Sequence, residues 1–148
     1  MKVVICGSRN LENYRLVEEA VSRSGYSIST VISGGARGVD RLGIAFARAH
    51  HLPVQVFMPD WERLGKRAGF VRNRQMAEIA EAVVAVWDGQ SRGTRHMIEL
   101  ASLRNLPCFV LLVNCNQTFN PKIKGVTFAR FSRSPWRSAY AATNSTCC

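Results

Sequence analysis

Three short segments of the sequence combine glycine with arginine in a way that favours anion binding. They are residues 7–9 (Gly-Ser-Arg), 34–38 (Gly-Gly-Ala-Arg-Gly) and 89–95 (Gly-Gln-Ser-Arg-Gly-Thr-Arg). Glycine lets a backbone approach a ligand closely, N–H groups at a helix start attract phosphate, and arginine binds phosphate through paired hydrogen bonds. Each segment lies between an expected strand and an expected helix. A parallel sheet would therefore bring all three to one edge.

Three of the arginines occupy positions at which a bound anion would be stabilising. Arg92 and Arg95 flank the start of an expected helix, and Arg37 precedes another. The positive end of a helix dipole disfavours a cation by a few tenths to ~1 kcal/mol, a conflict that an anion would remove. The alternatives are that Arg95 pairs with Glu99 one turn further on and that Arg37 points into water.

The segment from Ala68 to Glu99 contains an expected helix, a buried strand and the third glycine-arginine segment in succession. Arg72 and Met76 are four residues apart on the buried face of that helix, but Arg72 occupies the first turn, where its head can emerge at the strand ends. We therefore expect Arg72 to contact the ligand. The neighbouring Asn73 either caps the backbone or contacts a sugar.

Other side chains near the expected strand ends have two interpretations each. Asp40 lies in the first turn of a helix, where a carboxylate either caps N–H groups or contacts the ligand. Trp61 and Trp87 either stack on a base or pack at the rim of the core. The hydroxyls of Ser8 and Thr94 can donate to phosphate, but no histidine is placed to activate either as a nucleophile.

The apolar pattern that must position these residues alternates strands with amphipathic helices. The expected strands are Lys2–Cys6, Ile28–Ser33, Pro53–Met58, Ala82–Trp87 and Leu106–Val113, and the expected helices cover 13–25, 39–50, 70–80 and 94–104. Strands that alternate with helices indicate parallel pairing with right-handed crossovers. We therefore expect an α/β, Rossmann-like, three-layer doubly wound domain over residues 1–113, with a parallel sheet of about five strands.

Residues 114–148 break this alternation. They contain two prolines, a Ser/Thr/Asn-rich end and basic residues without any acid, and only Val126 to Phe131 shows strand-like alternation. We expect a basic, partly irregular C-terminal extension that packs on a sheet edge or on a neighbouring subunit.

Composition narrows the partners and the compartment. The net charge is +10, from 20 Lys and Arg against 10 Asp and Glu, which indicates either an anionic partner or a basic solvated surface. The five cysteines form no CxxC pair and no cluster with histidine, so we expect reduced thiols, no metal and no cofactor. No apolar run reaches the ~20 residues that span a bilayer, and the first strand begins at Lys2, before any signal peptide would fit. We expect a soluble, cytoplasmic protein that does not bind membranes.

The combined motifs resemble the YspA/YpsA-related branch of the SLOG superfamily, which groups the SMF/DprA proteins with the LOG (lonely guy) enzymes. The residues that carry the resemblance are Gly7-Ser8-Arg9, Ser33-Gly34-Gly35-Ala36-x-Gly38-x-Asp40, Asp60-Trp61, Ala68-Gly69-x-x-Arg72-Asn73-x-x-Met76 and Ser91-x-Gly93-Thr94. The resemblance covers residues 1–113 and implies a Rossmann-like domain that binds nucleotides or molecules derived from them. Members include sensor domains for ADP-ribose-type signals, and they often assemble as dimers or tetramers, so we expect a homo-oligomer.

The LOG enzymes hydrolyse a nucleoside monophosphate with an Arg-Lys pair and a PGGxGTxxE loop. Here Arg72 matches the arginine, but Asn73 replaces the lysine and Met97 occupies the glutamate position. Glu99 lies about 200° further around the helix and cannot simply substitute. If the chain is a hydrolase, the residues that we expect to carry the chemistry are Arg72, Glu99 and Asp40.

Three functions follow from these patterns. We favour binding of a small phosphate-bearing nucleotide derivative, an ADP-ribose-like or cyclic nucleotide signal, by a sensor or by a sponge that sequesters it. The alternatives are LOG-like N-glycosidic hydrolysis of nucleoside monophosphates and nucleic-acid binding, since DprA proteins share the domain and the tail is basic. The predicted ligand contacts are Gly7, Ser8, Arg9, Gly34, Gly35, Arg37, Gly38, Asp40, Trp61, Arg72, Asn73, Ser91, Arg92, Gly93 and Thr94.

Overall fold

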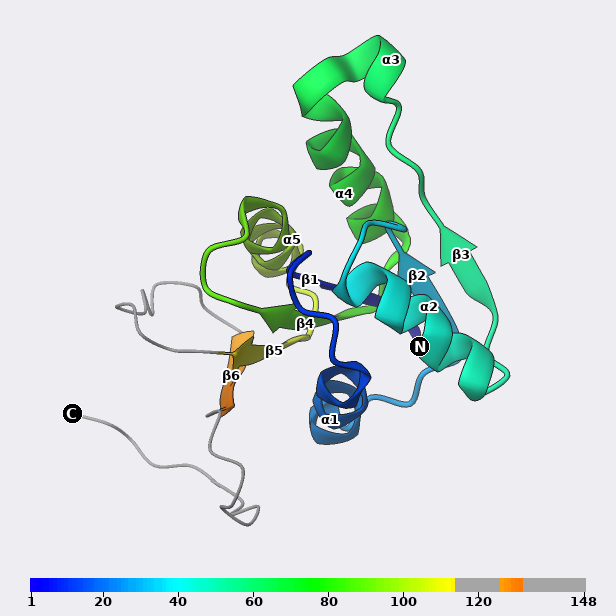
Figure 1. Cartoon of the computed structure of the whole chain (residues 1–148), viewed down its shortest axis with the longest axis vertical. Coiled ribbons are helices and arrows are strands. Elements are labelled where there is room, and N and C mark those ends of the chain that lie inside the picture. The colour runs from blue at the N-terminus through cyan, green and yellow to red at the C-terminus, as the bar shows by residue number, and fades with distance from the viewer. Residues whose placement is uncertain (114–125, 132–148) are drawn as a thin grey trace, which may run out of the picture.

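The computed structural model describes residues 1–113 and 126–131 and contains a parallel sheet with the strand order β3-β2-β1-β4-β5-β6 (Figure 1). The strands are β1 (Lys2–Gly7), β2 (Thr30–Ser33), β3 (Val54–Val56), β4 (Ala82–Trp87), β5 (Cys108–Val113) and β6 (Val126–Phe131). The helices are α1 (Tyr14–Ser24), α2 (Val39–Ala49), α3 (Trp61–Leu64), α4 (Ala68–Ile79) and α5 (Arg92–Leu103), with a 3-10 turn, η1, at Gly65–Arg67.

The order of the strands reverses between β1 and β4. The chain moves outward from β1 through β2 to β3 and then returns to place β4 on the other side of β1. In open parallel sheets, ligands bind in the crevice beyond the carboxyl ends of the two strands at such a reversal. The fold therefore points to the loops after β1 and β4.

Helices cover both faces of the sheet, as the continuous apolar strands require. On one face, Val3 and Ile5 of β1 pack with Val17 of α1 and with α2. On the other face, Val4 and Cys6 pack with α4 and α5. The predicted α/β, three-layer, doubly wound fold is confirmed.

The five predicted strands are present, although β2, β3 and β5 are shorter than expected. β6 adds a sixth strand and pairs in parallel with β5 from Cys108↔Val126 to Val113↔Phe131, so the sheet is wider than the sequence analysis predicted. The remainder of the predicted C-terminal extension, residues 114–125 and 132–148, lies outside the described residues. None of the described helices is long and apolar enough to span a membrane.

The observed helix starts differ from the predicted ones, and side-chain capping accounts for α3 and α5 but not for α4, whose N-cap residue makes no side-chain cap hydrogen bond. The Asp60 carboxylate accepts a hydrogen bond from the Arg63 N–H at 3.0 Å and begins α3, a helix that the sequence analysis missed. α4 begins at Ala68 instead of residue 70. α5 begins at Arg92 instead of residue 94, because Ser91 caps it.

A close contact between α2 and β1 gives a test of this packing. A Cβ added at Gly43 of α2 would lie 2.8 Å from Cγ2 and 2.9 Å from Cβ of Ile5. We expect Gly43→Ala to lower the free energy of unfolding by about 1–2 kcal/mol, because overpacking outweighs the ~1 kcal/mol gain in helix propensity. Urea denaturation measures this change.

The control is Ala45→Gly at an exposed position of the same helix. It should lose about 1 kcal/mol through helix propensity alone. A Gly43→Ala variant more stable than the wild type would contradict the close packing of α2 on β1.

Candidate functional site

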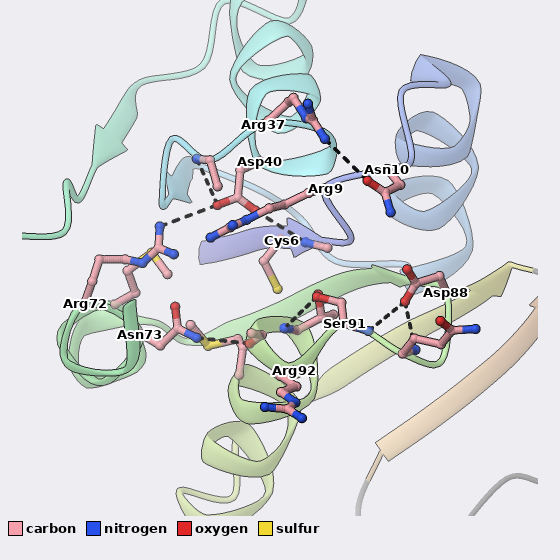
Figure 2. A pocket seen from close by; sticks show the side chains of 17 residues that line it. Cys6, Arg9, Asn10, Arg37, Asp40, Arg72, Asn73, Asp88, Ser91 and Arg92 are labelled. Carbon is pink, nitrogen blue, oxygen red and sulfur yellow. Dashed lines mark hydrogen bonds and ion pairs between the residues drawn. The ribbon is translucent and has the colours of Figure 1, made fainter. Parts of the chain in front are cut away.

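A cavity of about 460 Å³ lies beyond the carboxyl ends of β1 and β4, where the strand order reverses. Its volume falls within the range typical of small-molecule sites. Figure 2 shows the side chains that surround it, from β1, from the loops after β1, β2 and β4, and from α2, α4 and α5. Because α4 begins at Ala68, Arg72 lies in the second turn of this helix and not in the first turn as expected. The predicted contacts that line it are Gly7, Arg9, Arg37, Asp40, Arg72, Asn73, Ser91, Arg92, Gly93 and Thr94.

The remaining predicted contacts do not line the cavity. Ser8 is fully buried, and its hydroxyl oxygen accepts a hydrogen bond from the Asp88 N–H at 3.1 Å, which ties the loop after β1 to the loop after β4. Gly38 has a φ of 79°, and a Cβ there would lie 2.5 Å from the Ser8 carbonyl oxygen. Ser8 and Gly38, like Gly34 and Gly35, are therefore not part of the lining of the cavity.

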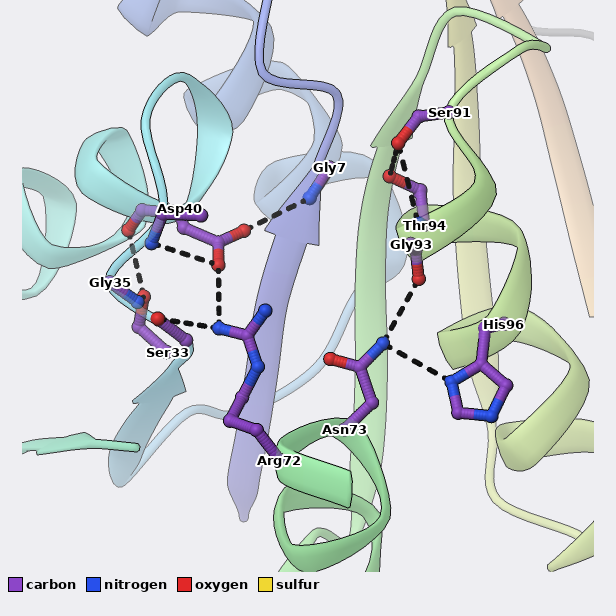
Figure 3. A network of polar contacts seen from close by, with 12 residues as sticks. Gly7, Ser33, Gly35, Asp40, Arg72, Asn73, Ser91, Gly93, Thr94 and His96 are labelled. Carbon is purple, nitrogen blue, oxygen red and sulfur yellow. Dashed lines mark hydrogen bonds and ion pairs between the residues drawn. The ribbon is translucent and has the colours of Figure 1, made fainter. Parts of the chain in front are cut away.

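A buried ion pair connects three of the elements around the cavity (Figure 3). The Asp40 carboxylate accepts hydrogen bonds from the N–H groups of Gly7 and Ala36, each at 3.4 Å. Its Oδ2 lies 3.6 Å from Nη1 of Arg72, which also donates to the Gly34 carbonyl oxygen. The capping interpretation of Asp40 is therefore corrected, because the carboxylate binds loop N–H groups that precede its own helix.

The ion pair of Asp40 and Arg72 is buried, and this burial affects the pKa of its carboxylate. Burial raises the pKa of Asp40 above its usual value, although Arg72 and the two N–H donors act in the opposite direction. Nε of Arg72 is buried and has no hydrogen-bond partner among the described residues. A Cβ at Gly34 would overlap the Arg72 guanidinium, so only glycine leaves room for this arginine.

The start of α5 forms the opposite wall. The Ser91 hydroxyl oxygen accepts from the Thr94 N–H at 3.4 Å and from the Thr94 hydroxyl at 3.0 Å. Asp88 Oδ1 accepts from the N–H groups of Gln90 and Ser91, at 2.9 and 2.8 Å. Burial alone would raise the pKa of Asp88, but these hydrogen bonds outweigh it and lower the pKa. Both Ser91 and Asp88 therefore hold the loop in shape.

Several charged and aromatic candidates lie elsewhere. Arg95 pairs with Glu99 at 2.8 Å on an exposed part of α5, so the ion-pair alternative is confirmed for Arg95. Glu99 does not line the cavity, whereas Met97 of the same helix does. Trp87 donates from Nε1 to the Ser91 carbonyl oxygen at 3.2 Å and packs against the core. Trp61 of α3 is 51% exposed and does not line the cavity.

Comparison with known proteins identifies the family of this chain. Residues 1–64, which include the loops after β1 and β2, match the sequence profile described as YAcAr: YspA, cpYpsA-related SLOG family. The Gene 61 protein of Mycobacterium phage D29 is 33% identical over 116 residues, which span 72% of this chain and 92% of that protein. This chain belongs to the YspA, cpYpsA-related SLOG family.

Among solved structures, a de novo designed protein with a P-loop NTPase fold is 17% identical, with a TM-score of 0.43. The match covers 88% of this chain and 82% of the designed protein. Membership of the SLOG family, together with the Rossmann-like fold, supports a nucleotide-related role for this chain.

The apolar part of the cavity of this SLOG protein was not predicted from the sequence. Cys6, Met76 and Met97 line it beside the polar groups, as do Asn10 and Ala36. Burial raises the pKa of the Cys6 thiol well above its usual value, so the group stays protonated at neutral pH. The three sulfur-containing residues had the pattern of ordinary core positions, and only the packing of β1, α4 and α5 around the cavity shows that they line it.

The buried ion pair leads to a stability prediction. We expect Asp40→Asn to lower the free energy of unfolding at pH 7 by about 3 kcal/mol, because it leaves the buried Arg72 without a counter-charge. Urea denaturation measures the loss. An Asp40→Asn variant within 0.5 kcal/mol of the wild type, on the order of the error expected for such measurements, would contradict a stabilising role for the carboxylate.

Asp88 leads to a pH prediction of known sign. Its pKa is lower in the folded chain than in the unfolded chain, so its contribution to stability is present above the unfolded value of about 3.9 and is lost as the pH falls through the folded value. Asp88→Asn keeps an acceptor for Gln90 and Ser91 but cannot titrate. Urea unfolding below about pH 4 should therefore depend less steeply on pH in the variant than in the wild type. Equal slopes would argue against this role.

Proposed function

We propose that this protein binds a small phosphate-bearing nucleotide derivative in the cavity, an ADP-ribose-like or cyclic nucleotide signal, without cleaving it. The observation that carries the proposal is the concentration of guanidinium groups around one cavity. Those groups belong to Arg9, Arg37, Arg72 and Arg92. The acidic side chains that line the same cavity, Asp40 and Asp88, already accept hydrogen bonds from backbone N–H groups.

Most of this positive charge is available to a ligand. Within residues 1–113 and 126–131, the guanidinium groups of Arg9 and Arg92 make no hydrogen bond and no ion pair, and that of Arg37 makes only a 3.5 Å contact with Asn10 Oδ1. Arginine forks bind phosphate through two parallel, charge-assisted hydrogen bonds. A phosphate group would therefore gain direct partners without breaking existing ones.

The first turn of α5 adds backbone donors. The cap uses the Thr94 N–H, while no described group accepts from the N–H groups of Arg92 and Gly93. A helix N-terminus favours an anion and disfavours the Arg92 side chain, so an anion at this position relieves an existing conflict.

The apolar side chains that line the cavity suit the less polar part of a nucleotide. Cys6, Met76 and Met97 contribute apolar atoms to the cavity. A site of this volume fits a small ligand that carries charge at one end, which is the chemistry of a nucleotide derivative. Binding of this kind suits a sensor of a signal molecule or a protein that sequesters it.

The hydrolytic alternative has less support. N-glycosidic hydrolysis needs a carboxylate that can reach the sugar, yet Glu99 pairs with Arg95 outside the cavity, and Met97, which occupies the position of the LOG glutamate, lines it. The oxygens of Asp40 face Arg72 and two N–H donors. Capture without cleavage agrees better with these contacts.

Two arginines of the same helix provide a matched test. We expect Arg92→Ala to weaken binding of ADP-ribose, AMP or cyclic AMP, whichever binds the wild type, by about 10- to 100-fold, the effect of losing charge-assisted hydrogen bonds. Arg95→Ala, one turn away, removes the same charge from the exposed pair with Glu99 and should change the affinity less than about threefold. Isothermal titration calorimetry measures both affinities.

Chromatography of the incubated probe separates the remaining functions. Recovery of intact nucleotide supports capture, whereas release of a free base establishes hydrolysis. Failure of the wild type to bind any of the three probes would reject the proposal. Equal losses of affinity in Arg92→Ala and Arg95→Ala would indicate a general effect of positive charge. Nucleic-acid binding depends on such a general effect and weakens steeply with salt.

A further inference from the structure

The amide of Asn73 is held in one orientation by two acceptors. Asn73 lies in α4, is only 5% exposed and lines the cavity. Its Nδ2 donates to the Gly93 carbonyl oxygen at 3.1 Å and lies 3.3 Å from Nδ1 of His96 (Figure 3). Both hydrogens of the amide nitrogen therefore have partners on α5.

These partners leave no choice about which end of the amide faces α5. A backbone carbonyl oxygen can only accept a hydrogen bond, so the nitrogen of Asn73, and not its oxygen, must face Gly93. The contact with His96 then requires an unprotonated Nδ1, which is the neutral imidazole with its proton on Nε2.

The surroundings of His96 favour that neutral form. Burial lowers the pKa of His96, and Arg74 lowers it further, while Glu99 acts in the opposite direction. The Phe70 ring packs edge-on against the imidazole, with ring centroids 4.7 Å apart. The same contacts from α4 and α5 also keep the ring in place.

The oxygen of the amide is left without a partner. Asn73 Oδ1 points away from α5, toward the side of Arg72, and accepts no hydrogen bond from any described residue. This oxygen is not one of the fully enclosed polar atoms of the described residues, so a ligand in the cavity can reach it. It is a neutral acceptor fixed among several arginine donors of the cavity.

We propose that Asn73 Oδ1 accepts a hydrogen bond from a ribose hydroxyl of the ligand, with the Gly93 carbonyl oxygen fixing the amide and the protonation state of His96 adjusting how firmly it is held. The inference rests on the proposed function, because it assumes a phosphate at the neighbouring start of α5. Phosphate oxygens cannot donate to Oδ1, so a neutral donor must approach it. In a nucleotide, the donors nearest to the phosphate are the ribose hydroxyls.

The arrangement makes recognition of the hydroxyl dependent on pH. Below the pKa of His96, Nδ1 carries a proton and faces the amide N–H group with a second donor. This second donor opposes the orientation that the Gly93 carbonyl oxygen holds, so Oδ1 is fixed less firmly in the cavity. Discrimination in favour of ribose is therefore present at neutral pH and weakens as the pH falls through the lowered pKa of His96.

The experiment compares AMP and ADP-ribose with their 2′-deoxy and 3′-deoxy counterparts by calorimetry. The wild type should bind at least one deoxy counterpart about tenfold more weakly than the parent, the effect of one lost hydrogen bond in a buried site. Asn73→Ala should bind parent and deoxy forms equally. His96→Ala keeps the bond to Gly93, so its discrimination should persist when the pH is lowered.

The outcomes separate this inference from the function on which it rests. Failure of the wild type to bind any nucleotide rejects the proposed function and this inference with it. Binding with equal affinity for parent and deoxy forms, or discrimination that survives in Asn73→Ala, overturns only the role of Asn73. A nitrogen-15 NMR spectrum of the unliganded wild type adds a test without variants, since a His96 proton on Nδ1 at neutral pH would also overturn it.

Discussion

The contact between Asp40 and Arg72 is the interaction on which the cavity depends. The carboxylate joins the N–H groups of Gly7 and Ala36, so one side chain links the loops after β1 and β2. Arg72 extends the link to α4 through the Gly34 carbonyl oxygen. A buried pair of this kind adds little net stability compared with apolar packing, but loss of either partner is costly. Its effect here is geometric, because it fixes the distance between elements that are far apart in the sequence.

The opposite wall depends on a different constraint. Ser8, Asp88 and Ser91 use their side chains to fix the loop after β4, so that the start of α5 faces the cavity. The loop is therefore shaped by polar contacts before any ligand arrives. Arg92 remains at the positive end of the helix, where its charge is locally unfavourable. Local conflicts of this sort are expected where function, and not stability, has selected the residue.

Much of this architecture could be predicted because the signals were strong and local. Continuous apolar runs such as Ala82–Trp87 identify buried strands, and alternation with helices identifies parallel pairing. The topology then places the glycine-arginine segments together. α3 was missed because it contains four residues and depends on the Asp60 cap.

The differences between the predicted ligand contacts and the residues that line the cavity share one physical cause. Trp61 and Glu99 are of residue types that often contact ligands, but their positions depend on tertiary contacts that periodicity cannot supply. Cys6 and Met97 were overlooked for the converse reason, since apolar residues at core spacing give no sign that they reach the end of the sheet. The amide of Asn73 had two interpretations from sequence, and its contacts with Gly93 and His96 show that it holds the backbone of α5 with its nitrogen.

The two carboxylates that line the cavity, Asp40 and Asp88, have pKa values shifted in opposite directions. Such opposite shifts in one site often mark an acid and a base. Burial raises the pKa of Asp40, whereas backbone hydrogen bonds lower that of Asp88 despite its burial. A general acid, however, must direct a proton at the ligand, and the oxygens of Asp40 face Arg72 and N–H donors that a proton would displace. Asp88 Oδ1 is likewise committed to two loop N–H groups. The opposite shifts therefore follow from two structural roles, which agrees with the proposal that the arginine-lined cavity binds its ligand without cleaving it.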